Sequence, residues 1–399
     1  MTKGLRIALV TAFPPGKRTL NEYGFHLARA FADHPDVAEV IVLADILPDP
    51  EPELELDPAI RVKRVWHFNG VGTPLRLLQS LGAEKPDAVV YNTQTASFGD
   101  NELTAALGLL TPVASRLVGW KSGVIAHNII DGLDLENTIL KGQGVRQAVV
   151  RLGGTMVTRA MTWASYTTVT LRGYVDTLKN MVPNADVTLV PHGTFEAGNR
   201  PWVSQSERPA RIVTMGKFGT YKRLETLLSA FDRLRQLPGA PKLELVIGGS
   251  DHPNAQGYME ALAQSRSSDR DVRFLGYVAE ADVPQFFETA RLAIFDYEAT
   301  TGSSGVLHQA ASFGTVPIFP RIGDFVDLCR DENLTGGSFA PRDADGLAQA
   351  MHELLTDTAA ADRIARSNRS AVAAIPMADI AAWHLGKILE TPDMMPVFE

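Results

Sequence analysis

The loop between Met215 and Leu224 combines glycines with cations, a composition typical of phosphate-binding loops. Its candidate ligands are Gly216, Lys217, Lys222 and Arg223. The loop follows an apolar run that predicts a buried strand, and it precedes a helical pattern. Glycine lets the backbone approach a ligand closely, a helix start offers unpaired N–H groups, and the cations add positive charge. We predict a phosphate or diphosphate site here; the competing interpretation is three solvated surface cations.

A second loop, Thr300–Leu307, is rich in glycine and small hydroxyl residues. Its candidate ligands are Thr301, Ser303, Ser304, Gly305 and Val306. The loop follows the apolar run that ends at Phe295 and opens a helical pattern that reaches about Phe313. Small residues at a helix start bind anions through backbone N–H groups, but they are equally an ordinary helix cap. Both interpretations stay open for this loop.

Two residues of the first half follow predicted buried strands. His127 follows the run Gly123–Ala126, and it can hydrogen-bond either a ligand or a nearby backbone carbonyl. Gly16 lies in the loop after the first predicted strand, Arg6–Ala12. That loop lacks the G-x-G-x-x-G pattern, and the chain holds no G-x-x-x-x-G-K-[ST] motif. The sequence therefore gives no support to an NAD, FAD or P-loop nucleotide site.

Three pairs of carboxylates one residue apart are candidates for a metal site. The pairs are Asp269/Asp271, Asp343/Asp345 and Asp296/Glu298. Only the last pair follows an apolar strand, and we interpret the other two as solvated loop acids. The single cysteine, Cys329, excludes an internal disulfide and a multi-cysteine zinc site. We expect no metal and no cofactor, and a metal at Asp296/Glu298 is the weaker interpretation.

Apolar runs alternate with amphipathic helical patterns along the whole chain. The predicted strands are Arg6–Ala12, Val40–Leu43, Ala88–Asn92, Gly123–Ala126, Thr168–Leu171, Thr188–Val190, Ile212–Met215, Leu243–Ile247, Val272–Leu275, Leu292–Phe295 and Val316–Phe319. Strands of this kind, separated by helices, indicate parallel sheets covered on both faces. A chain of 399 residues suits two domains. We predict Rossmann-like domains at 1–195 and 205–375, and a terminal helix within 376–399 that crosses back to the first domain.

Charge and hydropathy limit the partners. The formal net charge is -8, whereas a nucleic-acid binder needs a basic surface, so we predict no nucleic-acid partner. The apolar run that ends at Ala12 is too short to span a membrane and precedes no cleavage-site pattern. We therefore expect a cytoplasmic protein.

The segment 137–175 contains no acidic residue. Its basic residues are Lys141, Arg146, Arg151, Arg159 and Arg172, and apolar residues stand between them. A basic amphipathic segment can lie on an anionic membrane, here the inner face, and reach a lipid-linked acceptor. It can also be an ordinary helix with its apolar face in the core. Both interpretations stay open.

Together the loops resemble those of the retaining glycosyltransferases of the GT-B fold, a family that includes bacterial mannosyl- and glucosyltransferases and sucrose synthases. The likeness covers about 210–357. It is carried by Gly216-Lys217, Lys222–Leu228, Leu245–Gly249, Val272–Val278, Ser338-Phe339 and the pattern with Leu347 and Leu354. The resemblance implies an α/β fold of two Rossmann-like domains facing a cleft. It also implies metal-independent transfer of a hexosyl unit, with retention, from a nucleotide-diphosphate sugar to a glycan or lipid-linked acceptor.

The resemblance assigns roles to single residues. Lys217 and Lys222 match the pair that binds the donor diphosphate, and His127 matches a histidine that contacts the donor sugar. Gly16 matches the glycine-rich first loop that approaches the phosphates. The residues that match positions beside the nucleotide base are Gly276, Tyr277 and Val278.

One departure from the family pattern concerns two glutamates that usually flank the second phosphate-binding helix. Thr301 and Gln309 stand at their positions in this chain. The amide oxygen of Gln309 can still accept ribose hydroxyls, but Thr301 cannot replace a carboxylate near the transferred sugar. A nucleotide-sugar epimerase of the same fold and a catalytically idle nucleotide- or sugar-binding protein therefore stay open as alternatives. A pyridoxal-phosphate phosphorylase is a weaker one, because no lysine motif for that cofactor is evident.

Overall fold

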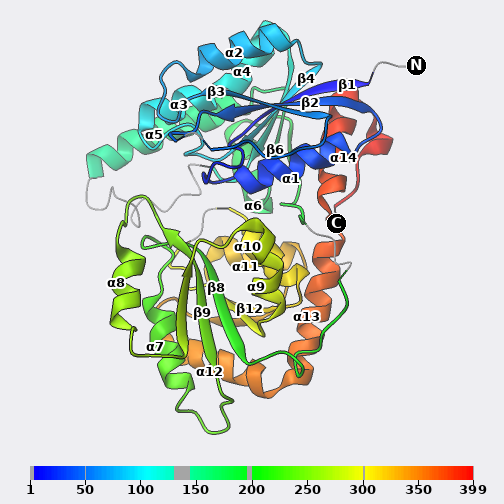
Figure 1. Cartoon of the computed structure of the whole chain (residues 1–399). Coiled ribbons are helices and arrows are strands. Elements are labelled where there is room, and N and C mark those ends of the chain that lie inside the picture. Colours follow the sequence, from blue (N-terminus) through cyan, green and yellow to red (C-terminus); the bar gives the residue numbers. More distant parts are fainter. Residues whose placement is uncertain (1–3, 50, 130–143, 196–199, 300–301, 399) are drawn as a thin grey trace. The chain divides into compact units, whose positions relative to one another are not determined.

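The computed structural model describes residues 4–49, 51–129, 144–195, 200–299 and 302–398, which form two α/β units (Figure 1). Of the described residues, the first unit holds those up to Phe195 and those from Ile375 onward, and the second holds those from Arg200 to Ala374. Each unit contains one parallel sheet with helices packed on it. The predicted pair of Rossmann-like domains is confirmed.

The first sheet has seven parallel strands in the order β3-β2-β1-β4-β5-β6-β7. The strands are β1 Leu5–Val10, β2 Val37–Asp45, β3 Ile60–Trp66, β4 Ala88–Thr93, β5 Lys121–Ala126, β6 Tyr166–Val169 and β7 Val187–Leu189. Central strands such as β1 and β4 are buried on both faces, because helices cover the two sides of the sheet. The chain order reverses beside β1, where open α/β sheets bind ligands.

Strand β3 is absent from the sequence prediction. It alternates apolar and charged residues, and Arg61 and Lys63 form ion pairs with Glu84; Arg61 also lies 2.7 Å from Glu39. Because β3 is an edge strand, one face can carry charge. A search for continuous apolar runs misses such a strand.

Helices α2–α6 contact one another as one layer on the first sheet, and α1 packs against α14 (Figure 1). The helices are α1 Asn21–Ala32, α2 Thr73–Glu84, α3 Glu102–Leu109, α4 Thr111–Val118, α5 Gly144–Met161, α6 Arg172–Met181 and α14 Met377–Leu389. Ile380 and Trp383 of α14 are buried in the first unit. His384 lies 3.0 Å from the Tyr166 hydroxyl, so the end of the chain is part of this core.

The second sheet has six strands in the order β10-β9-β8-β11-β12-β13. The strands are β8 Arg211–Phe218, β9 Glu244–Asp251, β10 Val272–Gly276, β11 Leu292–Ile294, β12 Val316–Pro320 and β13 Gly337–Phe339. The helices are α7 Glu225–Leu234, α8 Tyr258–Ser265, α9 Val283–Glu288, α10 Gly305–Ser312, α11 Gly323–Asp331, α12 Ala344–Thr356 and α13 Thr358–Ala373. The predicted apolar face of α7, with Leu227 and Phe231, is buried in the core. None of the helices in the described parts of the chain has the length and apolar character needed to cross a membrane.

Candidate functional site

Glycines of three neighbouring strands align at the carboxyl edge of the second sheet. In the strand register Gly216 pairs with Gly249, and Gly276 pairs with Gly248. Gly249 has a φ of 136°, and a Cβ there would lie 2.0 Å from the carbonyl oxygen of Gly216. Side chains are therefore excluded where the two backbones leave the sheet, and the loops that follow start close together.

Lys222 is held above this edge by aromatic rings. A tight turn closes with the N–H of Gly219 donating to the carbonyl of Lys222 over 2.9 Å. The Lys222 Nζ lies 4.4 Å from the centroid of the Tyr297 ring and 5.9 Å from that of Tyr221. Burial acts to lower the pKa of Lys222, but the two tyrosines outweigh it and the pKa lies above its ordinary value. The side chain is therefore a cation at neutral pH.

Lys217 and Lys222 gather with a residue that sequence reasoning missed. His252 directly follows β9, and its N–H donates to the carbonyl of Phe218 over 2.7 Å. Burial lowers the pKa of His252, and the charges of Lys217 and Lys222 lower it further. Three nitrogen-bearing side chains therefore share one electrostatic environment. Its position just past an apolar strand, the signal that singled out His127, could have identified His252.

The start of α7, expected to offer free N–H groups, is partly occupied. The N–H of Leu224 donates to the Tyr258 hydroxyl over 2.8 Å, and that of Leu227 donates to the Asp296 carboxylate over 2.9 Å. Two of the four N–H groups that a helix start leaves unpaired are thus occupied. Arg223 is also engaged, since its guanidinium donates to Glu225 over 2.7 Å and 3.1 Å. At this loop the two lysines, rather than the helix, provide the attraction for an anion.

The carboxylates that were candidates for a metal site form hydrogen bonds or ion pairs with other residues of the protein. Asp296 caps α7, and burial raises its pKa to about 6. Glu298 accepts a hydrogen bond from Arg342 over 2.9 Å. Asp269 pairs with Arg235, Asp343 caps α12 and Asp345 pairs with Arg233. In the described part of the chain, no three His, Cys, Asp or Glu side chains are grouped as a metal site requires.

The start of α10 and the loop after β8 each hold an unsatisfied hydroxyl. The Ser304 hydroxyl caps the helix by accepting from the N–H of Leu307 over 3.4 Å. Among the described residues, the buried hydroxyl oxygens of Ser303 and Thr220 have no hydrogen-bond partner. Gly305 and Val306 form the first turn of α10. Thr301 lies outside the described residues.

Contacts with α11 connect this serine-glycine loop to Lys222. The N–H of Gly302 donates to Asp324 over 3.3 Å. The next residue, Phe325, packs against Tyr297 with ring centroids 5.9 Å apart, and Tyr297 in turn holds Lys222. The two predicted anion-binding loops therefore lie at the same edge of the sheet.

His308 forms a buried ion pair behind the α10 start. Its Nδ1 lies 2.8 Å from the carbonyl oxygen of Ser304, and its Nε2 hydrogen-bonds the carboxylate of Glu332. Burial acts to lower the pKa of His308, but Glu332 outweighs it and the pKa is raised. With an acceptor at each ring nitrogen, His308 fixes the backbone of Ser304. The sequence carried no periodic signal for this pair.

The remaining predicted donor residues flank the same edge. Gly276 has a φ of 72°, and the side chain of Tyr277 is 52% exposed. Val278 covers Gly248, where an added Cβ would lie 2.5 Å from the Val278 side chain. Gln309 is half-buried on α10, one turn after its start.

His127 and Gly16 belong to the first unit. The Nε2 of His127 lies 2.7 Å from the Oδ1 of Asn92, whose amide nitrogen donates to Thr11 over 2.9 Å. This network makes Nε2 the donor and leaves Nδ1 as the acceptor nitrogen of a neutral ring. Burial lowers the pKa of His127 to about 3, and the Tyr23 ring packs edge-on against it at 4.4 Å. Gly16 closes a turn by donating to the Phe13 carbonyl over 3.2 Å.

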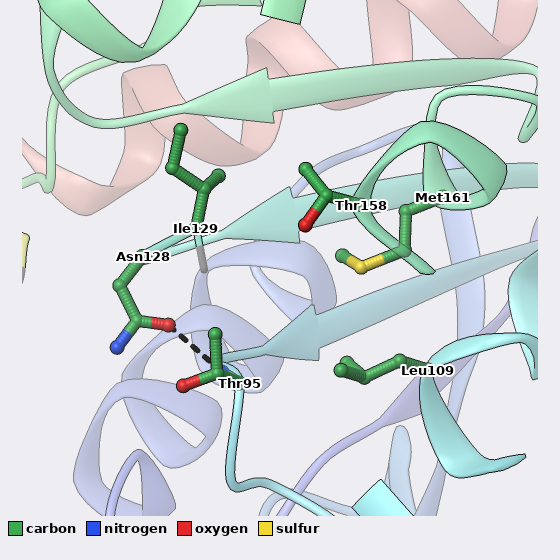
Figure 2. Close-up of a pocket in the computed structure, with 6 residues that line it drawn as sticks. All are labelled: Thr95, Leu109, Asn128, Ile129, Thr158 and Met161. Atoms are coloured by element: carbon green, nitrogen blue, oxygen red, sulfur yellow. Dashed lines mark hydrogen bonds between the residues drawn. The ribbon is translucent and has the colours of Figure 1, made fainter. Parts of the chain in front are cut away.

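A narrow pocket opens next to His127, at the carboxyl ends of β4 and β5 (Figure 2). It is lined by Thr95, Leu109, Asn128, Ile129, Thr158 and Met161. The Asn128 Oδ1 accepts from the N–H of Thr95 over 2.8 Å, which joins the two strand ends.

Comparison with known proteins places these features in context. Residues 209–357 match the family model described as "Glycosyl transferases group 1". The glycogen synthase of Mycobacterium tuberculosis is 28% identical over 187 residues, which cover 46% of this chain and 44% of that protein. The match thus spans less than half the length of that relative.

Solved structures resemble the whole chain. Sucrose-phosphate synthase from Thermosynechococcus elongatus superposes with a TM-score of 0.72 at 19% identity, covering 98% of this chain and 99% of that one. Anabaena Alr3699/HepE, solved in complex with UDP-glucose, gives a TM-score of 0.65 at 15% identity, covering 98% and 100%. The chain therefore has the GT-B fold, and its residues 209–357 are similar to the group 1 glycosyltransferase domain.

Proposed function

We propose that the chain is a glycosyltransferase that moves a hexosyl unit from a nucleotide-diphosphate sugar to a glycan or lipid-linked acceptor. One observation carries the proposal: Lys217, Lys222 and His252 gather at the sheet edge that also holds the unsatisfied Ser303 hydroxyl. The UDP-glucose of one structural neighbour and the name of the glycogen synthase relative support a nucleotide-sugar donor and a glycan acceptor. A cytoplasmic location belongs to the same proposal.

The leaving group of this reaction is a nucleoside diphosphate, whose negative charge grows as the glycosidic bond breaks. Lys217 and Lys222 would stabilise that charge directly, and the N–H groups of Gly305 and Val306 would add dipoles. These groups supply positive charge without a metal. Gln309 would accept a ribose hydroxyl, and Tyr277 would lie beside the base.

Retention of anomeric configuration is the finer part of the proposal. A covalent route needs a carboxylate nucleophile beside the sugar. Asp296 caps α7 and Glu298 is bound to Arg342, so the two described carboxylates after β11 are engaged elsewhere. This supports attack on the face from which the diphosphate departs. The neutral His127 would orient the sugar by accepting a hydroxyl hydrogen bond at Nδ1.

A thermal-shift panel with UDP, GDP and ADP tests the donor site. Selective stabilisation by one nucleotide identifies the donor class, and a ligand at a hundred times its Kd stabilises by about 2.7 kcal/mol. Product analysis with glycan and lipid-linked acceptors then tests transfer, and NMR of the product reports the anomeric configuration. No shift with any nucleoside diphosphate would refute the proposal.

Gln309 favours one rival, a protein that binds nucleotide without turnover. Tight nucleotide binding without diphosphate release against any acceptor supports that rival. Conversion of the donor in the absence of acceptor supports an epimerase instead.

A further inference from the structure

Exposed apolar side chains gather on one helical layer of the first unit. They are Val71, Leu75, Leu103, Leu110, Leu117, Val118, Leu152, Met156 and Trp163. All lie on or next to α2–α5, which pack together on the side of the sheet away from the α1–α14 pair (Figure 1). Several large apolar side chains exposed on neighbouring helices indicate an interaction site where they lie close together.

The ends of α4 and α5 form one surface. Arg116 Nη1 donates to the carbonyl oxygen of Trp163 over 2.8 Å and to that of Ala164 over 3.0 Å. Leu117, 82% exposed, and Trp163, 61% exposed, therefore lie on elements joined by direct hydrogen bonds. We call Leu117, Val118, Leu152, Met156, Trp163 and Arg159 the α4–α5 surface.

Helix α5 has apolar residues on two sides. Val157 and Met161 are buried, whereas Leu152 and Met156 are 67% and 64% exposed. The interpretation of this segment as an ordinary core helix accounts for the buried pair only. The exposed pair is available to an occupant outside the unit.

The charge of this surface indicates the occupant. Neither α4 nor α5 contains an acidic residue, although the chain as a whole carries a net charge of -8. Arg116 of α4 and Arg159 of α5 are both exposed. In a symmetric dimer the same face of both copies would meet, and these cations would repel one another. An anionic lipid surface instead attracts the cations and accepts the apolar side chains.

We propose that the α4–α5 surface docks on an anionic lipid bilayer, with Trp163 and Leu117 as its apolar anchors. Tryptophan suits the interface between headgroups and acyl chains, because one end of its ring is apolar and the other donates a hydrogen bond. The inference does not depend on the transferase activity, since no residue of the donor site takes part.

Vesicle co-sedimentation of the full chain tests the proposal. The probes are phosphatidylcholine vesicles with and without phosphatidylglycerol. The patch variants are the double substitution Leu117→Ser with Trp163→Ser, and Arg159→Gln. Matched controls are Val397→Ser, at an apolar residue 84% exposed, and Arg363→Gln, at an exposed arginine of α13.

We expect binding to the anionic vesicles only. The double substitution lowers the partition coefficient by at least about tenfold, and Arg159→Gln lowers it by about fivefold. The controls bind like the wild type. All sites are exposed, so unchanged circular dichroism and melting temperature will show that every variant folds.

Three results overturn the proposal: no binding of the wild type to anionic vesicles, equal binding to both vesicle types, or unchanged binding of the double variant. Light scattering, which measures the oligomeric state, tests the other possible occupant, a second copy of the chain. A wild-type dimer that the double substitution dissociates, without vesicle binding, would assign the surface to pairing between copies and overturn the lipid assignment.

Discussion

The ammonium nitrogen of Lys222 lies 4.4 Å from the centre of the Tyr297 ring, and the two residues also form an isolated backbone bridge. Lys222 belongs to the loop after β8, whereas Tyr297 follows β11, the neighbouring strand in the sheet. Tyr297 is 3% exposed and packs against Phe325. The position of the Lys222 ammonium group is therefore set by a residue more than seventy positions away in the chain.

Lys222→Ala should weaken nucleoside diphosphate binding by about ten- to a hundredfold, because one charge-assisted hydrogen bond contributes about 1.5–3 kcal/mol. Isothermal titration calorimetry with the nucleotide selected by the thermal-shift panel measures the effect. Lys242→Ala, at an exposed lysine of the same unit, should leave the affinity unchanged. A folded Lys222→Ala protein with wild-type affinity would remove the donor-site assignment.

His127→Ala should lower kcat/KM for transfer by about ten- to a hundredfold and leave nucleoside diphosphate affinity nearly unchanged. The reason is that His127 is assigned to the sugar, which the free diphosphate lacks. Its pKa of about 3 also predicts that His127 adds no titration to the rate profile between pH 5 and 8. His34→Ala, at a half-buried histidine of the same unit, serves as the control. Equal losses in diphosphate affinity and in turnover would contradict the assigned role.

Asp296 should make the stability of the protein fall as pH rises from about 4 to about 6. Burial raises its pKa from 3.8 to about 6 in the folded state, so the folded chain binds the proton more tightly than the unfolded chain. The stabilisation is complete below the unfolded pKa and is lost as pH rises through the folded pKa. Asp296→Asn removes this dependence.

Urea unfolding at several pH values measures the Asp296 effect. The difference between the wild-type and Asp296→Asn free energies of unfolding should change by up to about 1.4 kcal/mol per pH unit inside the window, and stay constant above it. Parallel curves for the two proteins would show that the carboxyl does not titrate in this range.

Gly249→Ala should destabilise the second unit by about 2–5 kcal/mol, because the new Cβ meets the Gly216 carbonyl at 2.0 Å and the φ of 136° is strained for alanine. Gly239→Ala is the matched control. Its φ is 79°, but nothing lies within 4 Å of the added Cβ, so about 1 kcal/mol of conformational strain is expected. Denaturant unfolding compares the two. Equal losses would mean that the close approach of β8 and β9 relaxes at little cost.

Donor affinity adds a second measure for these glycine variants. The backbone at Gly216 precedes Lys217, so a shift of that strand end should also weaken nucleotide binding in Gly249→Ala. Gly239 lies between α7 and β9, at the other end of the sheet, and its substitution should leave binding intact.

Hydropathy along the chain identified most strands and both sheets, because buried parallel strands must be apolar on two faces. It missed the three-residue strand β13. It also missed β3, since an edge strand can satisfy its charged residues, Arg61 and Lys63, through partners on other elements. It identified the loops after β8 and β11 as anion sites from glycine, hydroxyl and cation content. It could not show that Asp296 occupies the start of α7, because that contact joins residues sixty-nine positions apart.

The sequence by itself determined the α/β alternation, the division into two units and the residue types available at each strand end, because these follow from local periodicity and composition. Only the tertiary structure decided how those residues are grouped and paired. Arg223 is bound to Glu225, whereas Lys217 and Lys222 share an environment with His252. Such partnerships depend on strand order and register, which bring distant loops to one edge, and no local pattern encodes that order.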